Sequence, residues 1–167
     1  MARLRSQPLQ TLRQDSLISR GGRKSQSEGK GFEGIFKTIA QIEGIRIKKI
    51  PEFGRWIGPI AFKPIAGWVD FMLINHDGRV AFIDTKTIDA GAFQYSLIDR
   101  NQLDFLSSVG DLCPAGYVVC YRSTIQRVVY YKWNVLMSIQ PGSSLKPYDG
   151  IDLGPLFQFS AKKIFLA

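Results

Sequence analysis

The feature that most constrains the fold of this chain is a pair of apolar segments joined by a tight turn. The segments are WVDFMLIN at residues 68–75 and RVAFIDTK at residues 79–86, and Asp77 and Gly78 lie between them. An Asp-Gly pair flanked by short apolar runs is typical of a β-hairpin turn. The sequence therefore predicts two neighbouring antiparallel strands that are joined at this turn.

Charged residues occur at the ends of these two strands that lie away from the turn. Asp70 is near the start of the first strand, and Asp84 and Lys86 are near the end of the second. Antiparallel pairing brings these ends together, and residues two apart in a strand, such as Asp84 and Lys86, point to the same face. Because a carboxylate is costly to bury unless it is paired or bound to a metal, these aspartates require partners.

The spacing leaves two interpretations open. The first is a plain salt bridge between Lys86 and either aspartate at the edge of a sheet. The second is a site for Mg²⁺ or Mn²⁺, because two aspartates supply the oxygen ligands that these ions prefer. In that case the backbone carbonyl of Thr85 is a further ligand, and Lys86 stabilises charge on a phosphate or helps to activate a water. Such a site suits hydrolysis of a phosphodiester.

The remaining segments predict an α/β fold with a mixed sheet flanked by helices. Apolar residues at three- and four-residue steps predict a helix that begins at Gly31 and closes at Gly44. Residues 52–67 contain three glycines and two prolines, which favour an irregular connection. The other expected elements are strands at 45–50, 115–122 and 127–133, helices at 98–110 and near 134–140, and an edge strand in the C-terminal part.

Three further polar residues bear on the same site, and each has a simpler explanation. Glu33 lies beside the apolar stripe of the first helix, and it either leans toward a metal or is a solvated acid favoured by the helix dipole. Gln102 follows the expected N-cap Asp99 by three residues, so a capping box also explains it. His76 is the only histidine and is expected as a turn residue, which argues against a histidine-based catalytic triad.

The net charge of +8 is concentrated near the N-terminus. Residues 1–31 contain seven basic and two acidic residues, a net +5, so the rest of the chain carries +3. We predict a flexible basic arm at 1–27 and a globular domain at 28–167, and such arms bind nucleic acid. A solvated tail and a transit peptide are the alternatives. The DNA-binding candidates of the arm are Arg3, Arg5, Arg13, Arg20, Arg23, Lys24 and Lys30.

Cysteine use and hydropathy indicate where the protein works. Cys113 and Cys120 lie in an apolar stretch without the spacing of a metal site, so we expect buried, reduced thiols. No uninterrupted apolar run approaches the roughly 18 to 20 residues that a membrane-spanning helix needs. We therefore expect a cytoplasmic protein with no membrane partner, and the compactness of the chain favours a bacterial or phage-infected cell.

Asp70, followed on the next strand by Asp84-Thr85-Lys86, resembles the motif of the PD-(D/E)XK nuclease superfamily. Within it, the chain is most similar to RecU-type Holliday-junction resolvases, and the likeness covers roughly residues 28–133. The motifs that carry it are GWVDF at 67–71, AFIDTKT at 81–87 and AFQYSLIDRNQLDFL at 92–106. The resemblance implies a restriction-endonuclease-like α/β fold, with a mixed central β-sheet flanked by helices.

The resemblance also implies Mg²⁺-dependent cleavage of branched DNA by a homodimer, with one active site for each of two opposed strands. Its metal ligands, its lysine, the acid of its first helix and its glutamine correspond here to Asp70, Asp84, Lys86, Glu33 and Gln102. RecU-type enzymes insert a long stalk between their early strands to engage the junction centre. Residues 52–67, as an irregular connection, leave little room for such a stalk.

We therefore predict a structure-selective DNA endonuclease, most similar to a Holliday-junction resolvase that makes paired symmetrical nicks in four-way junctions. A restriction-like or repair endonuclease that acts on duplex or flap DNA is an alternative with the same fold and metal. A non-catalytic DNA-binding module of the same fold is an alternative from another class. Metal dependence separates this module from the two nucleases.

Overall fold

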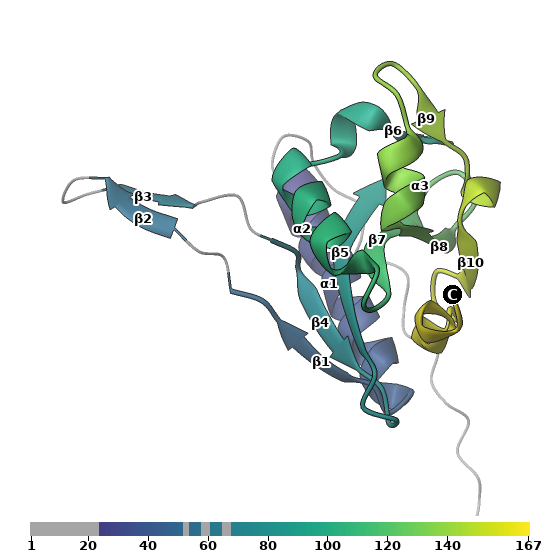
Figure 1. Ribbon diagram of the computed structural model, residues 1–167. Coiled ribbons are helices and arrows are strands. Elements are labelled where there is room, and N and C mark those ends of the chain that lie inside the picture. The colour runs from purple at the N-terminus through teal and green to yellow at the C-terminus, as the bar shows by residue number, and fades with distance from the viewer. Residues whose placement is uncertain (1–23, 52–53, 58–60, 65–67) are drawn as a thin grey trace, which may run out of the picture.

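The hairpin predicted at the Asp-Gly turn is present and lies within a mixed β-sheet (Figure 1). The computed structural model describes residues 24–51, 54–57, 61–64 and 68–167. The main sheet of this described part has six strands, which in spatial order are β1 (Arg46–Lys49), β4 (Phe71–Ile74), β5 (Val80–Ile88), β7 (Ala115–Tyr121), β8 (Arg127–Lys132) and β10 (Ile151–Pro155). Neighbouring strands are antiparallel except β5 and β7, which are parallel because the chain crosses the sheet between them through α2 (Arg100–Gly110).

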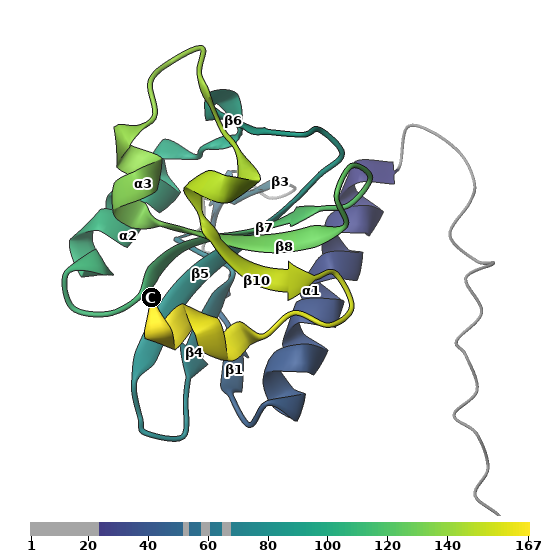
Figure 2. The same cartoon turned by 90° about the vertical axis from the view of Figure 1, so that its right-hand side faces the viewer.

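Helices cover both faces of this sheet, and Figure 2 shows the sheet between them. α1 (Lys24–Ile42) packs on one face, where Phe36 is fully buried, together with the 3-10 helix η4 (Ala161–Leu166). α2 and α3 (Trp133–Ser138) pack on the other face, where Leu106 and Leu136 are buried. The predicted mixed sheet flanked by helices is thus confirmed.

The C-terminus of α1 is the one predicted, whereas its N-terminus is earlier. Gly44 has φ of +78°, and the backbone N–H groups of Gly44 and Ile45 donate to the carbonyls of Gln41 and Ala40. This is a Schellman motif, in which glycine tolerates the left-handed conformation. The helix begins at Lys24 rather than at Gly31, so residues 24–27 of the predicted arm are helical. Apolar periodicity marks only the packed turns, and a helix continues past them at little cost once it is nucleated.

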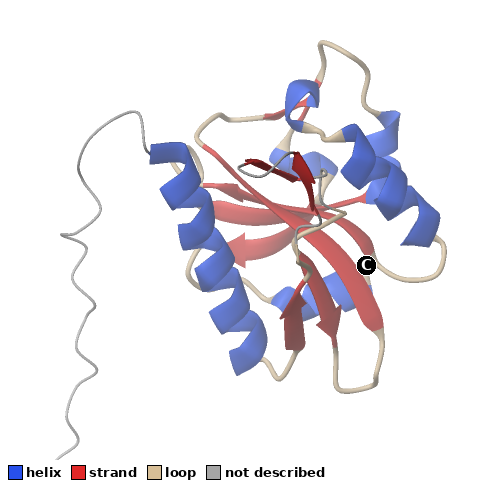
Figure 3. Ribbon diagram, turned by 90° about the vertical axis from the view of Figure 1, so that its left-hand side faces the viewer, coloured by secondary structure: helices blue, strands red, loops and turns tan. Residues whose placement is uncertain are grey.

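A second hairpin lies between β1 and β4, where we expected an irregular connection, and that expectation was wrong. β2 (Gly54–Ile57) and β3 (Ala61–Pro64) pair antiparallel, and Gly54 is opposite Pro64. Figure 1 shows this two-stranded hairpin standing out from the main sheet, and in Figure 3 the hairpin lies in front of the sheet. Glycine and proline are tolerated here because this pair ends the ribbon, where a missing ladder bond costs little.

The remaining elements are short. β6 (Phe93–Gln94) pairs antiparallel with β9 (Ser144–Leu145), and the 3-10 helices η2 (Tyr95–Leu97) and η3 (Pro147–Asp149) follow these strands. The expected C-terminal edge strand is β10, which pairs with β8. Both cysteines are free thiols, as predicted, although Cys113 is only half-buried whereas Cys120 is buried. None of the helices in the described ranges is long and apolar enough to cross a membrane.

Candidate active site

Strand β5 carries Asp84 into the interior on the α2 side of the sheet. Ala81 and Ile83 belong to the apolar cluster against α1, so the alternate residues of the strand, including Asp84, face α2. Asp84 is 1% exposed, and it is the one charged residue that is buried among those whose side chains the structure describes. A carboxylate this deep requires compensating partners.

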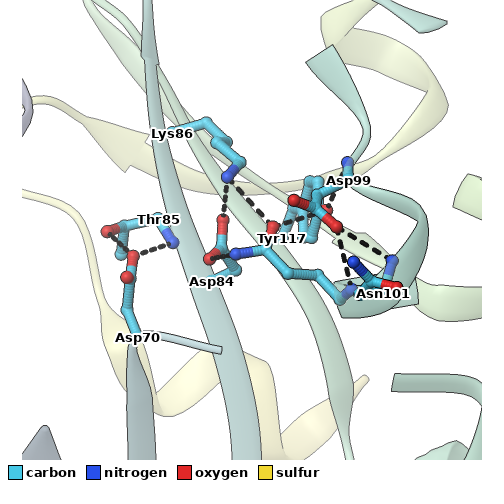
Figure 4. A network of polar contacts seen from close by, with 8 residues as sticks. Asp70, Asp84, Thr85, Lys86, Asp99, Asn101 and Tyr117 are labelled. Carbon is cyan, nitrogen blue, oxygen red and sulfur yellow. Dashed lines mark hydrogen bonds and ion pairs between the residues drawn. The ribbon is translucent and has the colours of Figure 1, made fainter. Parts of the chain in front are cut away.

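Two side chains contact the Asp84 carboxylate, one at each oxygen. The Lys86 Nζ lies 2.6 Å from Asp84 Oδ2 (Figure 4), and Gln102 donates from Nε2 to Asp84 Oδ1 at 2.7 Å. Lys86 also donates to Gln102 Oε1 at 3.1 Å, so the three side chains contact one another in a ring. The structure thus brings together three of the residues predicted for the site, two from β5 and one from the first turn of α2.

The start of α2 positions Gln102 for these contacts. Asp99 is the N-cap, as predicted, and its Oδ1 accepts from the backbone N–H groups of Asn101 at 2.8 Å and Gln102 at 3.3 Å. The capping-box explanation of Gln102 is wrong, because its side chain extends to Asp84. The backbone N–H of Asp99 donates instead to the Tyr117 hydroxyl at 3.3 Å.

Asp70 lies at the same end of the sheet and contacts β5 directly. β4 begins at Phe71, which is opposite Ile83, so the ladder between β4 and β5 ends one residue before Asp84. The Asp70 carboxylate continues it, because Oδ2 accepts from the backbone N–H of Thr85 at 2.8 Å and from the Thr85 hydroxyl at 2.6 Å (Figure 4). The amide and carbonyl of a strand residue point to the same edge, so the Thr85 carbonyl also faces the side of β4.

Burial dominates the electrostatics of Asp84. The pKa of Asp84 is raised from 3.8 to about 7, mainly by loss of water; the Lys86 ammonium opposes this rise, and the charge of Asp70 adds to it. The ion pair of the salt-bridge interpretation is present, but it leaves the pKa of Asp84 raised, and Asp70, which accepts from Thr85, forms no ion pair with any described residue. A further cation would offset both effects. Two carboxylates and a backbone carbonyl are hard oxygen donors, so the donor set at this end of the sheet fits Mg²⁺.

Glu33 is not placed as a direct metal ligand beside Asp70 and Asp84. Its carboxylate forms an ion pair with Lys49 of β1 at 2.7 Å, and its side chain is 24% exposed. Among the described side chains, no group of three histidine, cysteine, aspartate or glutamate residues is arranged to hold a metal ion. Glu33 therefore does not join Asp70 and Asp84 as a third carboxylate in this structure. Its role as a ligand stays a prediction, which requires Lys49 to release it.

One residue of the site, Tyr117 of β7, was missed by the sequence analysis. Its hydroxyl donates to Gln102 Oε1 at 2.9 Å, and Lys86 Nζ lies 5.1 Å from the centre of its ring. The side chain is fully buried. The periodicity of the strand does not single out Tyr117, but its chemistry does. A tyrosine within a central apolar strand needs a hydrogen-bond partner for its hydroxyl.

The other predicted residues contribute less. His76 is exposed at the hairpin tip with its Nε2 3.0 Å from Asp77, as expected of a turn residue. The arm residues Arg3, Arg5, Arg13, Arg20 and Arg23 lie outside the described residues, while Lys24 and Lys30 belong to α1. Their DNA-binding role stays a prediction.

The comparisons with known proteins agree with the fold. No protein-family model and no curated protein matches the sequence. Among solved structures, the fold is similar to that of Hjc, a Holliday junction resolvase from the archaeal hyperthermophile Archaeoglobus fulgidus, with a TM-score of 0.53 and 12% sequence identity. The match covers 74% of this chain and 95% of that chain. At this identity the likeness establishes the fold, and the restriction-endonuclease-like sheet predicted from the sequence is confirmed.

Proposed function

We propose that this protein is a Mg²⁺-dependent DNA endonuclease that cuts branched DNA, with four-way junctions as its substrate. The observation that carries the proposal is the buried Asp84, held by Lys86 and Gln102 beside Asp70. A stable fold gains nothing from a second carboxylate that raises the pKa of the buried Asp84, whereas phosphodiester hydrolysis requires such a site. The resolvase-like fold supports a nuclease of this kind.

In this proposal Asp70 and Asp84 hold Mg²⁺, and the Thr85 carbonyl is a further ligand. The bound ion would offset charge on the phosphate and favour ionisation of the attacking water. Lys86 neutralises part of the carboxylate charge before DNA binds, and its 27% exposed side chain can also reach a phosphate. Gln102 holds one oxygen of Asp84 and so orients the carboxylate. Mn²⁺ should substitute, because it prefers the same oxygen donors.

Two features support branched DNA as the substrate. The β2–β3 hairpin stands out from the sheet between β1 and β4, the place where RecU-type resolvases insert a stalk (Figure 1). The net +5 charge of residues 1–31 favours phosphate contacts with little sequence preference. Paired nicks in opposed strands require two active sites, so we propose a homodimer of RecU type.

Cleavage of a labelled four-way junction and of a matched linear duplex, in Mg²⁺ and in EDTA, tests this proposal. We expect paired symmetrical nicks in the junction that are lost with EDTA and in Asp84→Asn. The matched control is Asp111→Asn, which removes the same charge from an exposed residue at the opposite end of α2 from Gln102.

The outcomes separate the alternatives. Cutting of the linear duplex at a similar rate would replace the resolvase with a restriction-like or repair endonuclease. Tight DNA binding without cutting in Mg²⁺ or Mn²⁺ would leave a non-catalytic DNA-binding module, in which Asp84 and Lys86 form a structural salt bridge.

A further inference from the structure

We propose that Tyr117 is a positioning residue of this site, whose hydroxyl fixes the orientation of the Gln102 amide and so holds the amide NH₂ group on Asp84. Its effect on cleavage rests on the proposed function. Its effect on the Gln102 side chain does not, because that arrangement exists in the protein without metal or DNA.

The polarity of the hydrogen-bond chain has one solution. The backbone N–H of Asp99 can only donate, so the Tyr117 oxygen accepts from it at 3.3 Å. The Tyr117 proton is then free to donate to Gln102 Oε1 at 2.9 Å. Lys86 Nζ, which can also only donate, approaches the same oxygen at 3.1 Å. With two donors on Oε1, the NH₂ group of Gln102 faces Asp84 Oδ1 at 2.7 Å.

The surroundings of Tyr117 make it suited to this task. Its side chain is fully buried in β7, and its ring packs edge-on against Phe93 with centroids 5.9 Å apart and planes at 87°. Burial raises the pKa of Tyr117, and the charge of Asp84 raises it further, so the hydroxyl stays protonated and able to donate. The ring has little freedom to move, and its hydroxyl is anchored to the N-cap of α2.

The same chain ties three elements of the fold to one carboxylate. Asp99 caps α2, Tyr117 comes from β7, and Gln102 carries the contact to Asp84 on β5. Without the tyrosine hydroxyl, Lys86 would be the remaining donor to Gln102 Oε1 among these residues. Because Lys86 is also paired with Asp84, it holds the amide less firmly, and the NH₂ group can rotate away from the carboxylate.

Tyr117→Phe, Gln102→Ala and the double variant test the proposal in the full chain. Tyr130→Phe is the matched control, because Tyr130 is also a buried strand tyrosine (1% exposed) and its hydroxyl has no hydrogen-bond partner among the described residues. On four-way junction DNA in Mg²⁺, we expect Tyr117→Phe to lower kcat about tenfold, the value of one hydrogen bond. Its Kd for the junction, measured in Ca²⁺, should change by less than about twofold, and Tyr130→Phe should change neither quantity.

The double variant distinguishes positioning from general destabilisation. If Tyr117 acts through Gln102, Tyr117→Phe should have no further effect on kcat in the Gln102→Ala background. Additive effects of the two substitutions would overturn the proposal, because they would show that the tyrosine acts independently of the amide.

A spectroscopic readout keeps the proposal testable without activity. In metal-free wild-type protein, the ¹⁵N-resolved side-chain amide of Gln102 should have one proton resonance shifted downfield of an ordinary side-chain amide by its hydrogen bond to Asp84 Oδ1. This downfield shift should be lost in Tyr117→Phe and persist in Tyr130→Phe. An unshifted amide proton in the wild type, or an unchanged shift in Tyr117→Phe, would refute the proposal. If wild type cuts no DNA, the proposed function fails, while these spectra still decide the role of Tyr117.

Discussion

Substitution of Asp84 by asparagine should stabilise the metal-free protein at high pH. The folded state raises the pKa of Asp84 from 3.8 to about 7, mainly by burial. At about 1.4 kcal/mol for each pKa unit, that difference corresponds to about 4 kcal/mol lost from the free energy of unfolding when Asp84 is ionised. The contribution of Asp84 to stability is therefore fully present below pH 3.8 and is lost as pH rises through about 7.

Asparagine removes the cost of burying a charged carboxylate, but the free energy of unfolding does not rise by that full amount. Its carbonyl can still accept from Gln102, whereas its NH₂ group would face the Lys86 ammonium, which lies 2.6 Å from Asp84 Oδ2. An unsatisfied donor of this kind costs about 1 to 3 kcal/mol. We therefore expect Asp84→Asn to gain about 1 to 3 kcal/mol at pH 8, and to be no more stable than wild type near pH 4.

Urea denaturation from pH 4 to pH 8 in EDTA measures this difference. Asp111→Asn, which removes an exposed charge at the end of α2, should follow the wild type across the range. A difference between Asp84→Asn and wild type that does not grow with pH would refute the reasoning. So would a wild type that is more stable than Asp84→Asn at pH 8, because the buried carboxylate would then be compensated in full by Lys86.

Two further predictions follow from the packing and the charge distribution. Gly110→Ala should destabilise the protein by about 1 to 3 kcal/mol in urea denaturation, because a Cβ there would overlap the Trp133 indole. The control Gly34→Ala, on α1 with open space around it, should be neutral or stabilising. Deletion of residues 1–23 should weaken junction binding and flatten its salt dependence, while cleavage at saturating DNA persists. Titrations at several salt concentrations would reveal an unchanged slope if this segment makes no phosphate contacts.

The parts of the site that the sequence predicted are those that depend on local rules. The two-residue period of a strand puts Asp84 and Lys86 on one face, and the Asp-Gly turn sets the register that brings Asp70 to their end of the sheet. The Gly44 helix end and the Asp99 N-cap follow from backbone geometry and a single side chain. Each of these depends on residues that are close in sequence or joined by one tight turn.

The contacts that the sequence did not predict involve choices between partners far apart in the chain. The side chain of Gln102 has two chemically reasonable partners, the backbone N–H of Asp99 and the carboxylate of Asp84. It contacts Asp84 because the crossover from β5 through α2 sets the helix start above that strand. Glu33 on α1 pairs with Lys49 of the edge strand β1, whereas Asp84 faces the α2 side of the sheet, away from α1. Local propensity carries no information about which of these partners is nearer.

The sequence by itself determined the hairpin, the pairing of an acid and a lysine on one strand face, and the mixed sheet flanked by helices. Only the tertiary structure decided that Asp84 is buried rather than exposed at the edge of the sheet. It also decided that Lys86 and Gln102 contact Asp84 and that Tyr117 contacts Gln102. The physical reason is that the burial of Asp84, which raises its pKa, depends on how α2 packs over β5 and its neighbour β7. Periodicity assigns a residue to a face, but the elements that cover that face determine its chemistry.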